Sequence, residues 1–267
     1  MLTKTTKKKT SSILITGGSG GIGRALVKGF AKAGWEVHFT YRSDKKSADA
    51  IIKNVGPTVK AYVLDQGDPE SINLFIKTLK SPIDAIIHNA ALGSATVEKY
   101  ADNKHEQDEA LLKVNSLGPM WLTEALLPKI LRSRKTRGQG KIIFISSVGG
   151  GITHFPKFRA ADGMSKAALT FYARTLASEL THEAVDVFTI CPGATETEMF
   201  LASTLKKMTQ TEKKKFINHL PKRRLIQPEE IANLALYLCS ESSIILHGAV
   251  LDASQGLGNR PGVLTEL

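Results

Sequence analysis

The chain of 267 residues has only two cysteines, Cys191 and Cys239. Both lie in apolar stretches, FTICPG and LYLCSE, which favours buried free thiols in a reducing cytoplasm over a disulfide. No Cys or His pair has the spacing of metal ligands, so we expect no metal site. No apolar run reaches the roughly 18 residues that a membrane helix needs. We therefore expect a cytoplasmic protein without a membrane-spanning segment.

The N-terminus, MLTKTTKKKTSS, is polar and lysine-rich, which is not the pattern of a secretory signal. We predict a disordered basic tail over residues 1–11 and one domain over 12–267. The formal net charge is +11, and further basic residues gather in 131–141 and 205–224. Such runs are usually solvated surface, and no nucleic-acid-binding motif accompanies them, so we expect no nucleic-acid partner. Alternatively, these basic residues help to capture an anionic ligand.

Short β-branched runs alternate with helical patterns along most of the chain. The helical patterns cover 24–34, 47–56, 68–80, a long segment at about 105–132, and 160–181. Strands are predicted over 12–17, 36–42, 59–66, 83–91, 141–147, 184–193 and 249–256. Strands that alternate with helices of this length predict an α/β protein. The expected fold is a single doubly wound Rossmann domain, with a seven-stranded parallel sheet flanked by helices.

A glycine-rich stretch, TGGSGGIG (16–23), follows the first predicted strand and opens the first predicted helix. In this position Gly17 permits a tight turn, Gly21 lets the backbone approach a phosphate, and Gly23 allows close packing of helix and strand. The start of the helix offers free N–H groups and a positive dipole end. The stretch therefore predicts a dinucleotide site.

The end of the second predicted strand, FTYRS, has Tyr41 and Arg42 where an NAD site usually has an acidic residue. An arginine suits a 2′-phosphate, because its guanidinium makes bidentate contacts. Arg24 either adds a second positive charge or lies on a solvated helix face. We predict NADP(H) as the cofactor.

Together these stretches resemble the classical short-chain dehydrogenase/reductase family over nearly the whole chain. The family's motifs are matched by TGGSGGIG, LDQGDPESI, HNAA, KVNSLGP, FISSVGG and CPGATETEM. The resemblance implies a catalytic Asn115, a catalytic serine at Ser147 or alternatively Ser146, and a lysine, Lys166, that also binds the nicotinamide ribose. The implied cofactor-binding residues are Gly17, Ser19, Gly21, Ile22, Gly23, Tyr41, Arg42, Asp65 (against the adenine), Gln66, Asn89, Ala90, Pro192, Gly193, Thr195 and Thr197. It also implies a homodimer or homotetramer packed through 105–132 and 160–181.

One element departs from the family pattern. The signature YxxxK is DGMSK here, with Asp162 in the place of the tyrosine that exchanges a proton with the substrate oxygen. A carboxylic acid beside an ammonium group is ionised at neutral pH, so we predict a carboxylate paired with Lys166 that cannot donate a proton. Ordinary ketone reduction should then lose general-acid catalysis, typically a factor of about 100 to 10,000.

Several interpretations stay open at this point. In the first interpretation, the chain is an NADP(H)-dependent oxidoreductase with an altered site, which transfers hydride to a carbonyl, a conjugated thioester or an imine. In a second interpretation Asp162 is desolvated and acts as a true acid. In a third the protein is a non-redox NADP-binding regulator, or a lyase or isomerase with Asp162 as base. In the last it is an inactive relative. The resemblance implies that the small-molecule substrate is recognised mainly by residues 193–224. Arg159 either binds an anionic substrate or faces water.

Overall fold

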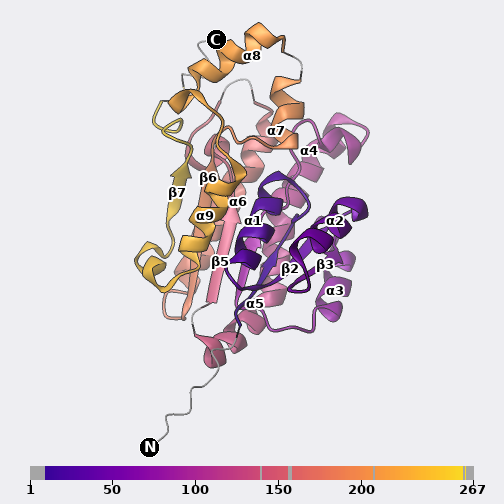
Figure 1. The fold of residues 1–267 in the computed structure, drawn as a ribbon, viewed down its shortest axis with the longest axis vertical. Helices are drawn as coiled ribbons and strands as arrows, with labels where there is room; N and C mark the ends of the chain where they lie inside the picture. The colour runs from indigo at the N-terminus through magenta and orange to yellow at the C-terminus, as the bar shows by residue number, and fades with distance from the viewer. Residues whose placement is uncertain (1–9, 139, 156–157, 207, 261, 263–267) are drawn as a thin grey trace, which may run out of the picture.

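The computed structural model describes residues 10–138, 140–155, 158–206, 208–260 and 262. Most of the predicted tail, 1–9, lies outside the described residues. Figure 1 shows a central sheet with helices in front of it and behind it. Among the described residues, no helix is both long enough and apolar enough to cross a membrane.

The sheet has seven parallel strands in the order β3-β2-β1-β4-β5-β6-β7. Their bounds are β1 Ser12–Ile15, β2 Glu36–Tyr41, β3 Val59–Val63, β4 Ala85–His88, β5 Gly140–Ile145, β6 Val185–Pro192 and β7 Val250–Ala253. All seven predicted strands and the doubly wound fold are confirmed. The order reverses between β1 and β4, and ligands of such sheets bind at this point, outside the carboxyl ends of the strands.

Two layers of helices cover the sheet. Their bounds are α1 Gly21–Lys32, α2 Lys45–Val55, α3 Pro69–Thr78, α4 Lys104–Leu112, α5 Gly118–Arg137, α6 Ala160–Glu179, α7 Glu198–Phe200, α8 Gln210–His219 and α9 Pro228–Leu238. Buried residues of α1, α2 and α9 pack on one face, and those of α3, α5 and α6 pack on the other. Within β1, Ile13 and Ile15 pack in the core on the face that α1, α2 and α9 cover. Leu14 packs in the core on the opposite face, as strand alternation requires.

The segment predicted as one long helix at about 105–132 is helical throughout, and it consists of α4, a π turn and α5 that adjoin without a gap. Between α4 and α5 lies a π-helical turn, η2 (Lys113–Leu117), which widens the helix around Asn115. Short π-bulges inside α-helices frequently mark functional sites. The predicted long helix is therefore confirmed, and the π turn at the position of the family motif was not predicted.

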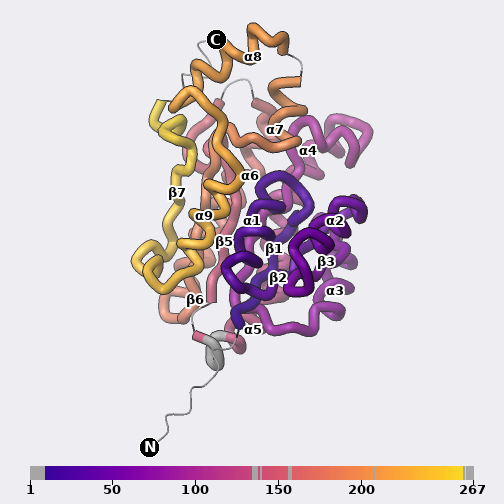
Figure 2. The backbone as a smooth tube through the Cα atoms, in the orientation of Figure 1, coloured from indigo at the N-terminus to yellow at the C-terminus, as the bar shows by residue number. Residues whose placement is uncertain are grey.

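Three of the helices and two short turns gather at one end of the molecule. Helices α4, α7 and α8 lie close to that end in Figure 2. α7 continues into a π turn, η4 (Leu201–Leu205), and a 3-10 turn, η1 (Val97–Lys99), precedes α4. These elements surround the carboxyl ends of the strands, where the predicted site residues also lie.

Candidate functional site

The glycine-rich loop begins at the carboxyl end of β1. Gly17 has a φ of +64°, and a Cβ there would lie 2.8 Å from the Cα of Ala90. A Cβ on Gly23 would lie 2.1 Å from the carbonyl oxygen of Gly17. Only glycine fits both places, so the loop folds tightly against the start of α1. That helix has Gly20 at its N-cap and no acidic residue in its first turn, which suits an anion.

Asn89 and Ala90 tie the loop to β4. Thr16, which the sequence-based prediction of binding residues omitted, accepts both of their backbone N–H groups through Oγ1 at 3.0 Å. The amide of Asn89 donates to the carbonyl oxygens of Thr16 and Gly17, at 3.0 and 3.1 Å. These two residues thus lie directly beneath the loop and fix its shape.

Arg42 and Asp65 lie together just past the ends of β2 and β3. Between them is Tyr100, a residue that the sequence analysis missed. The guanidinium carbon of Arg42 lies 4.6 Å from the centre of the Tyr100 ring, and the phenol oxygen lies 3.2 Å from both carboxylate oxygens of Asp65. Burial, helped by the Asp65 carboxylate, raises the pKa of Tyr100 to about 12, so its hydroxyl keeps its proton and donates it.

Two other predicted cofactor residues, Tyr41 and Gln66, have contacts of their own. Tyr41 is half-buried against the core that α1, α2 and α9 cover. Gln66 is 4% exposed and donates to the carbonyl oxygens of Ala90 and Val114, both at 2.8 Å. Its own Oε1 is buried without a hydrogen-bond partner among the described residues. Gln66 therefore joins the ends of β3 and β4 to η2.

The segment after β6 lies over the glycine-rich loop. A Cβ on Gly193 would come 2.9 Å from the Cβ of Ser254, and the hydroxyl of Thr195 donates to the Gly193 carbonyl at 3.0 Å. Thr197 caps α7 by accepting the backbone N–H of Phe200. Its methyl group leaves no room for a Cβ on Gly21, which would lie 2.6 Å away.

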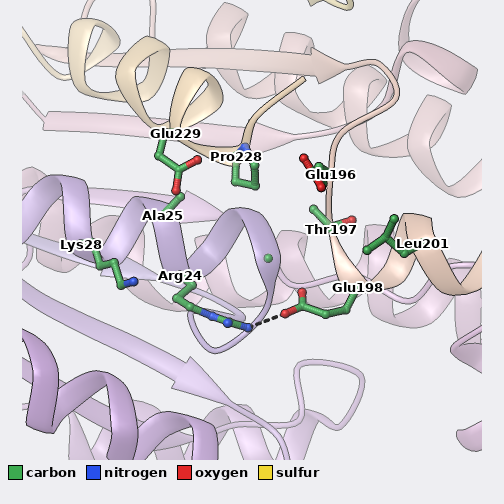
Figure 3. A pocket seen from close by; sticks show the side chains of 10 residues that line it. Arg24, Ala25, Lys28, Glu196, Thr197, Glu198, Leu201, Pro228 and Glu229 are labelled. Carbon is green, nitrogen blue, oxygen red and sulfur yellow. Dashed lines mark hydrogen bonds and ion pairs between the residues drawn. The ribbon is translucent and has the colours of Figure 1, made fainter. Parts of the chain in front are cut away.

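Helix α7 contacts both the loop after β4 and the first turn of α1. Met199 lies against Gly93, where a Cβ would meet the sulfur at 2.8 Å. Arg24 pairs with Glu198 at 2.8 Å (Figure 3). It also donates to the Ser19 carbonyl. Arg24 is therefore engaged by α7 and does not lie free on a solvated helix face. A cleft of about 310 Å³ opens on the outer side of this ion pair, lined by residues of α1, α7 and α9.

Asn115 is 1% exposed, in the π turn. Its Oδ1 accepts the backbone N–H of Leu92 at 2.7 Å, and its Nδ2 donates to the Leu92 carbonyl at 2.9 Å and to Oγ of Ser165 at 3.0 Å. One side chain thus holds the loop after β4 against α6.

The two candidate serines differ in their contacts. Ser146 is 5% exposed; its hydroxyl donates to the Lys166 carbonyl and accepts from Thr170, both at 2.9 Å. Ser147 is partly exposed, and its oxygen accepts only the backbone N–H of Gly149, at 3.2 Å. Among the described residues its hydroxyl proton has no recorded acceptor. The geometry favours Ser147 as the group that can donate to a substrate oxygen.

Asp162 and Lys166 come from successive turns of α6, and both side chains are partly exposed. Oδ2 of Asp162 accepts the backbone N–H of Ser94 at 3.2 Å and its hydroxyl at 2.9 Å. Nζ of Lys166 donates to the Ile145 carbonyl at 3.2 Å. Burial lowers the pKa of Lys166, and the nearby Asp162 opposes that shift.

The predicted ion pair between Asp162 and Lys166 is absent from these described side chains, so that prediction was wrong. The loop after β4, fixed by Asn115, presents two donors of Ser94 to the carboxylate. Lys166 instead extends to the carboxyl end of β5. The carboxylate is satisfied by the loop and not by the ammonium group.

Two other side chains close to the DGMSK motif in sequence, those of Arg159 and Tyr172, make contacts outside the site. Arg159 pairs with Asp108 at 2.7 Å and also donates to Gln107, so it anchors α4 and is not available for an anionic substrate. Tyr172 packs edge-on against Phe144 in the core, 5.7 Å between ring centres, and burial raises its pKa to about 12. It cannot replace the missing tyrosine.

Comparisons with known proteins agree with this architecture. Residues 17–258 match a protein-family model described as enoyl-(acyl carrier protein) reductase. The 3-oxoacyl-[acyl-carrier-protein] reductase FabG of Aquifex aeolicus is 31% identical over 251 residues, which are 91% of this chain and 96% of that protein. The oxidoreductase UcpA of Escherichia coli K12 is 30% identical over 256 residues, 91% of this chain and 94% of that protein.

Solved structures show the same fold. The RhlG/NADP active-site complex of Pseudomonas aeruginosa has a TM-score of 0.82 and 25% identity, and the match covers 93% of this chain and 96% of that one. The 3-ketoacyl-(acyl-carrier-protein) reductase of Brucella melitensis complexed with NADH has a TM-score of 0.81 at 24% identity, over 94% of this chain and 100% of that one. The chain belongs to the short-chain dehydrogenase/reductase family of oxidoreductases.

Proposed function

We propose that this protein is an NADP(H)-dependent oxidoreductase that reduces a conjugated thioester or an imine in preference to a simple ketone. The observation that carries the proposal is Asp162. It stands where the family has a proton-donating phenol, and its Oδ2 already accepts two hydrogen bonds from Ser94.

The proposed cofactor site has a chemically suitable set of residues for the pyrophosphate and the 2′-phosphate of NADP(H). The loop of Gly17 and Gly23 leaves no room for side chains, and α1 begins there with a positive dipole end for a pyrophosphate. Arg42 is exposed at the end of β2 and offers a guanidinium to a 2′-phosphate. Relatives solved with NADP and with NADH support the cofactor class. When bound, NADPH supplies a hydride.

The side chains around the substrate group that receives the hydride determine which substrate classes can react. Reduction of a ketone places negative charge on oxygen and needs a proton there, which a carboxylate in the phenol's place cannot give. In a conjugated thioester the charge moves to the thioester oxygen, where the Ser147 hydroxyl and the Lys166 ammonium can stabilise it; the carbon then takes its proton from water. In an imine the acceptor is most reactive as a cation, which a carboxylate stabilises.

The first test is a substrate panel of ketones, enoyl thioesters and cyclic imines, followed by the absorbance of NADPH. We expect turnover with one of the last two classes and slow turnover of ketones. Asp162→Tyr should gain ketone reduction. Fast ketone turnover by the unaltered protein would contradict the proposal.

Asp162→Asn distinguishes the two acceptor classes. The asparagine keeps an oxygen acceptor for Ser94 and removes the charge. Imine reduction should then fall, because the cation loses its counter-charge, whereas thioester reduction should be unchanged or faster. A protein that binds NADPH and oxidises it with none of these compounds would instead fit a non-redox NADP-binding role.

A further inference from the structure

The contacts of Tyr100 reproduce those that an adenine ring would make at the same place. Three segments meet there: the end of β2 with Arg42, the end of β3 with Asp65, and the turn after η1 with Tyr100. In Rossmann folds, the adenosine half of a dinucleotide lies at the ends of these first strands.

An adenine ring offers an amino group that donates hydrogen bonds and a π-face. Tyr100 offers the same two features. Its hydroxyl lies 3.2 Å from both carboxylate oxygens of Asp65, and its ring face lies under the guanidinium of Arg42 at 4.6 Å. At that distance the ring and the guanidinium are in contact, and no second ring fits between them.

The phenol is also held in place from below. A Cβ on Gly67 would lie 2.8 Å from the Tyr100 oxygen, so the hydroxyl sits directly over this glycine, and the ring packs beside the cluster that contains Val97 and Val114. The backbone N–H of Gly67 also donates to Asp65, at 2.9 Å. Tyr100 is therefore half-buried at a defined position and is not a loose surface side chain.

We propose that Tyr100 occupies the adenine subsite of the free protein, so that it competes with the adenine half of the cofactor for Arg42 and Asp65. This inference rests on the proposed NADP(H) site and adds a residue that sets the affinity for it. Binding of the cofactor requires Tyr100 to release both partners. Removal of the ring should therefore tighten binding.

The test is the dissociation constant of NADPH for the whole protein, measured by cofactor fluorescence, in Tyr100→Leu and Tyr100→Phe. A cation–π contact of about 1 kcal/mol is worth about fivefold in affinity, and a hydrogen bond to a charged group adds a similar factor or more. We expect Tyr100→Leu to bind NADPH at least about fivefold tighter than the unaltered protein. Tyr100→Phe, which frees only Asp65, should lie between the two.

The gain in affinity should occur only for ligands that contain the adenine half of the cofactor. The affinity for 2′-phospho-ADP-ribose should rise by the same factor as that for NADPH, and the affinity for reduced nicotinamide mononucleotide should stay unchanged. Tyr237→Leu is the matched control, since Tyr237 is an exposed tyrosine of α9, and it should leave all three affinities as they are.

Weaker or equal binding of NADPH by a folded Tyr100→Leu protein would overturn the inference, and weaker binding would make Tyr100 a support for Arg42. Thermal unfolding of each variant shows whether it is folded, and Tyr100→Phe, which keeps the ring, gives an independent result if the leucine variant does not fold. Failure of every variant and of the unaltered protein to bind NADPH would contradict the proposed function itself.

Discussion

The same substitution, glycine to alanine, should have opposite effects at two positions near the site. At Gly23 the added Cβ would lie 2.1 Å from the carbonyl oxygen of Gly17 and 2.8 Å from Nδ2 of Asn89. The first of these atoms belongs to the backbone of the glycine-rich loop, so the loop itself must move. At Gly163, in α6, a Cβ would meet nothing within 4 Å.

The magnitudes follow from these contacts. Overpacking of a filled site typically costs about 1–3 kcal/mol and occasionally more, and a backbone atom at such a distance places Gly23→Ala at the upper end of that range. A glycine within a helix is less stable than alanine by roughly 0.5–1 kcal/mol, so Gly163→Ala should stabilise the protein by about 0.5 kcal/mol. The two variants should therefore differ by about 3.5 kcal/mol in the free energy of unfolding.

Urea unfolding gives both free energies, and a fluorescence titration with NADPH gives the effect on the loop. We expect Gly23→Ala to weaken cofactor binding by at least about tenfold, because a shift of about 1 Å removes aligned N–H groups from the phosphate. Gly163→Ala should leave binding unchanged. If Gly23→Ala is as stable as the unaltered protein and binds NADPH equally well, the close packing inferred at this loop is wrong.

Two further predictions concern buried ionisable groups. Lys141 and Asp186 form a 2.7 Å ion pair, and their side chains are 3% and 4% exposed. Lys141→Met leaves the buried charge of Asp186 without its main partner, so it should cost about 3–5 kcal/mol in urea unfolding. The double variant Lys141→Met/Asp186→Leu should recover much of that loss. A double variant as unstable as the single one would contradict this. Burial lowers the pKa of His88 to about 3. Because the unfolded chain takes up a proton below about pH 6.5 and the folded chain does not, stability should fall by up to about 1.4 kcal/mol per pH unit as the pH drops from 6.5 toward 3. His88→Asn should remove this part of the slope between pH 6.5 and 5, and identical slopes would show that His88 does not contribute.

The sequence was sufficient for the sheet, because strand and helix periodicities are local properties. Ile13, Leu14 and Ile15 alternate between the two cores as their pattern predicts. The π turn at Asn115 was not predictable from periodicity, because the three hydrogen bonds of the Asn115 side chain join it to Leu92 and Ser165, residues 23 and 50 positions away.

The candidate site was predictable in its residue types and less so in its contacts. Spacing alone left Ser146 and Ser147 as alternatives, and only the folded chain shows that Ser146 is bonded to the Lys166 carbonyl. Helical spacing paired Asp162 with Lys166, but the loop after β4 supplies the actual partner, Ser94, which lies 68 residues earlier in the chain. Tyr100 carried no signal, because its partners come from two other strand ends.

The contacts of Asp162 explain how a carboxylate is accommodated in this position. Asn115 holds both backbone groups of Leu92, and Asp162 holds the N–H and hydroxyl of Ser94, two residues further along the same loop. Asp162 is thus part of the structure that fixes the loop after β4, as well as the charge that the proposed function places beside the substrate. Replacement by alanine would change both at once, so a loss of activity in that variant could not be assigned to chemistry. Asparagine keeps the acceptor and removes only the charge, and for this reason its effect on each substrate class reports the electrostatic role of Asp162 directly.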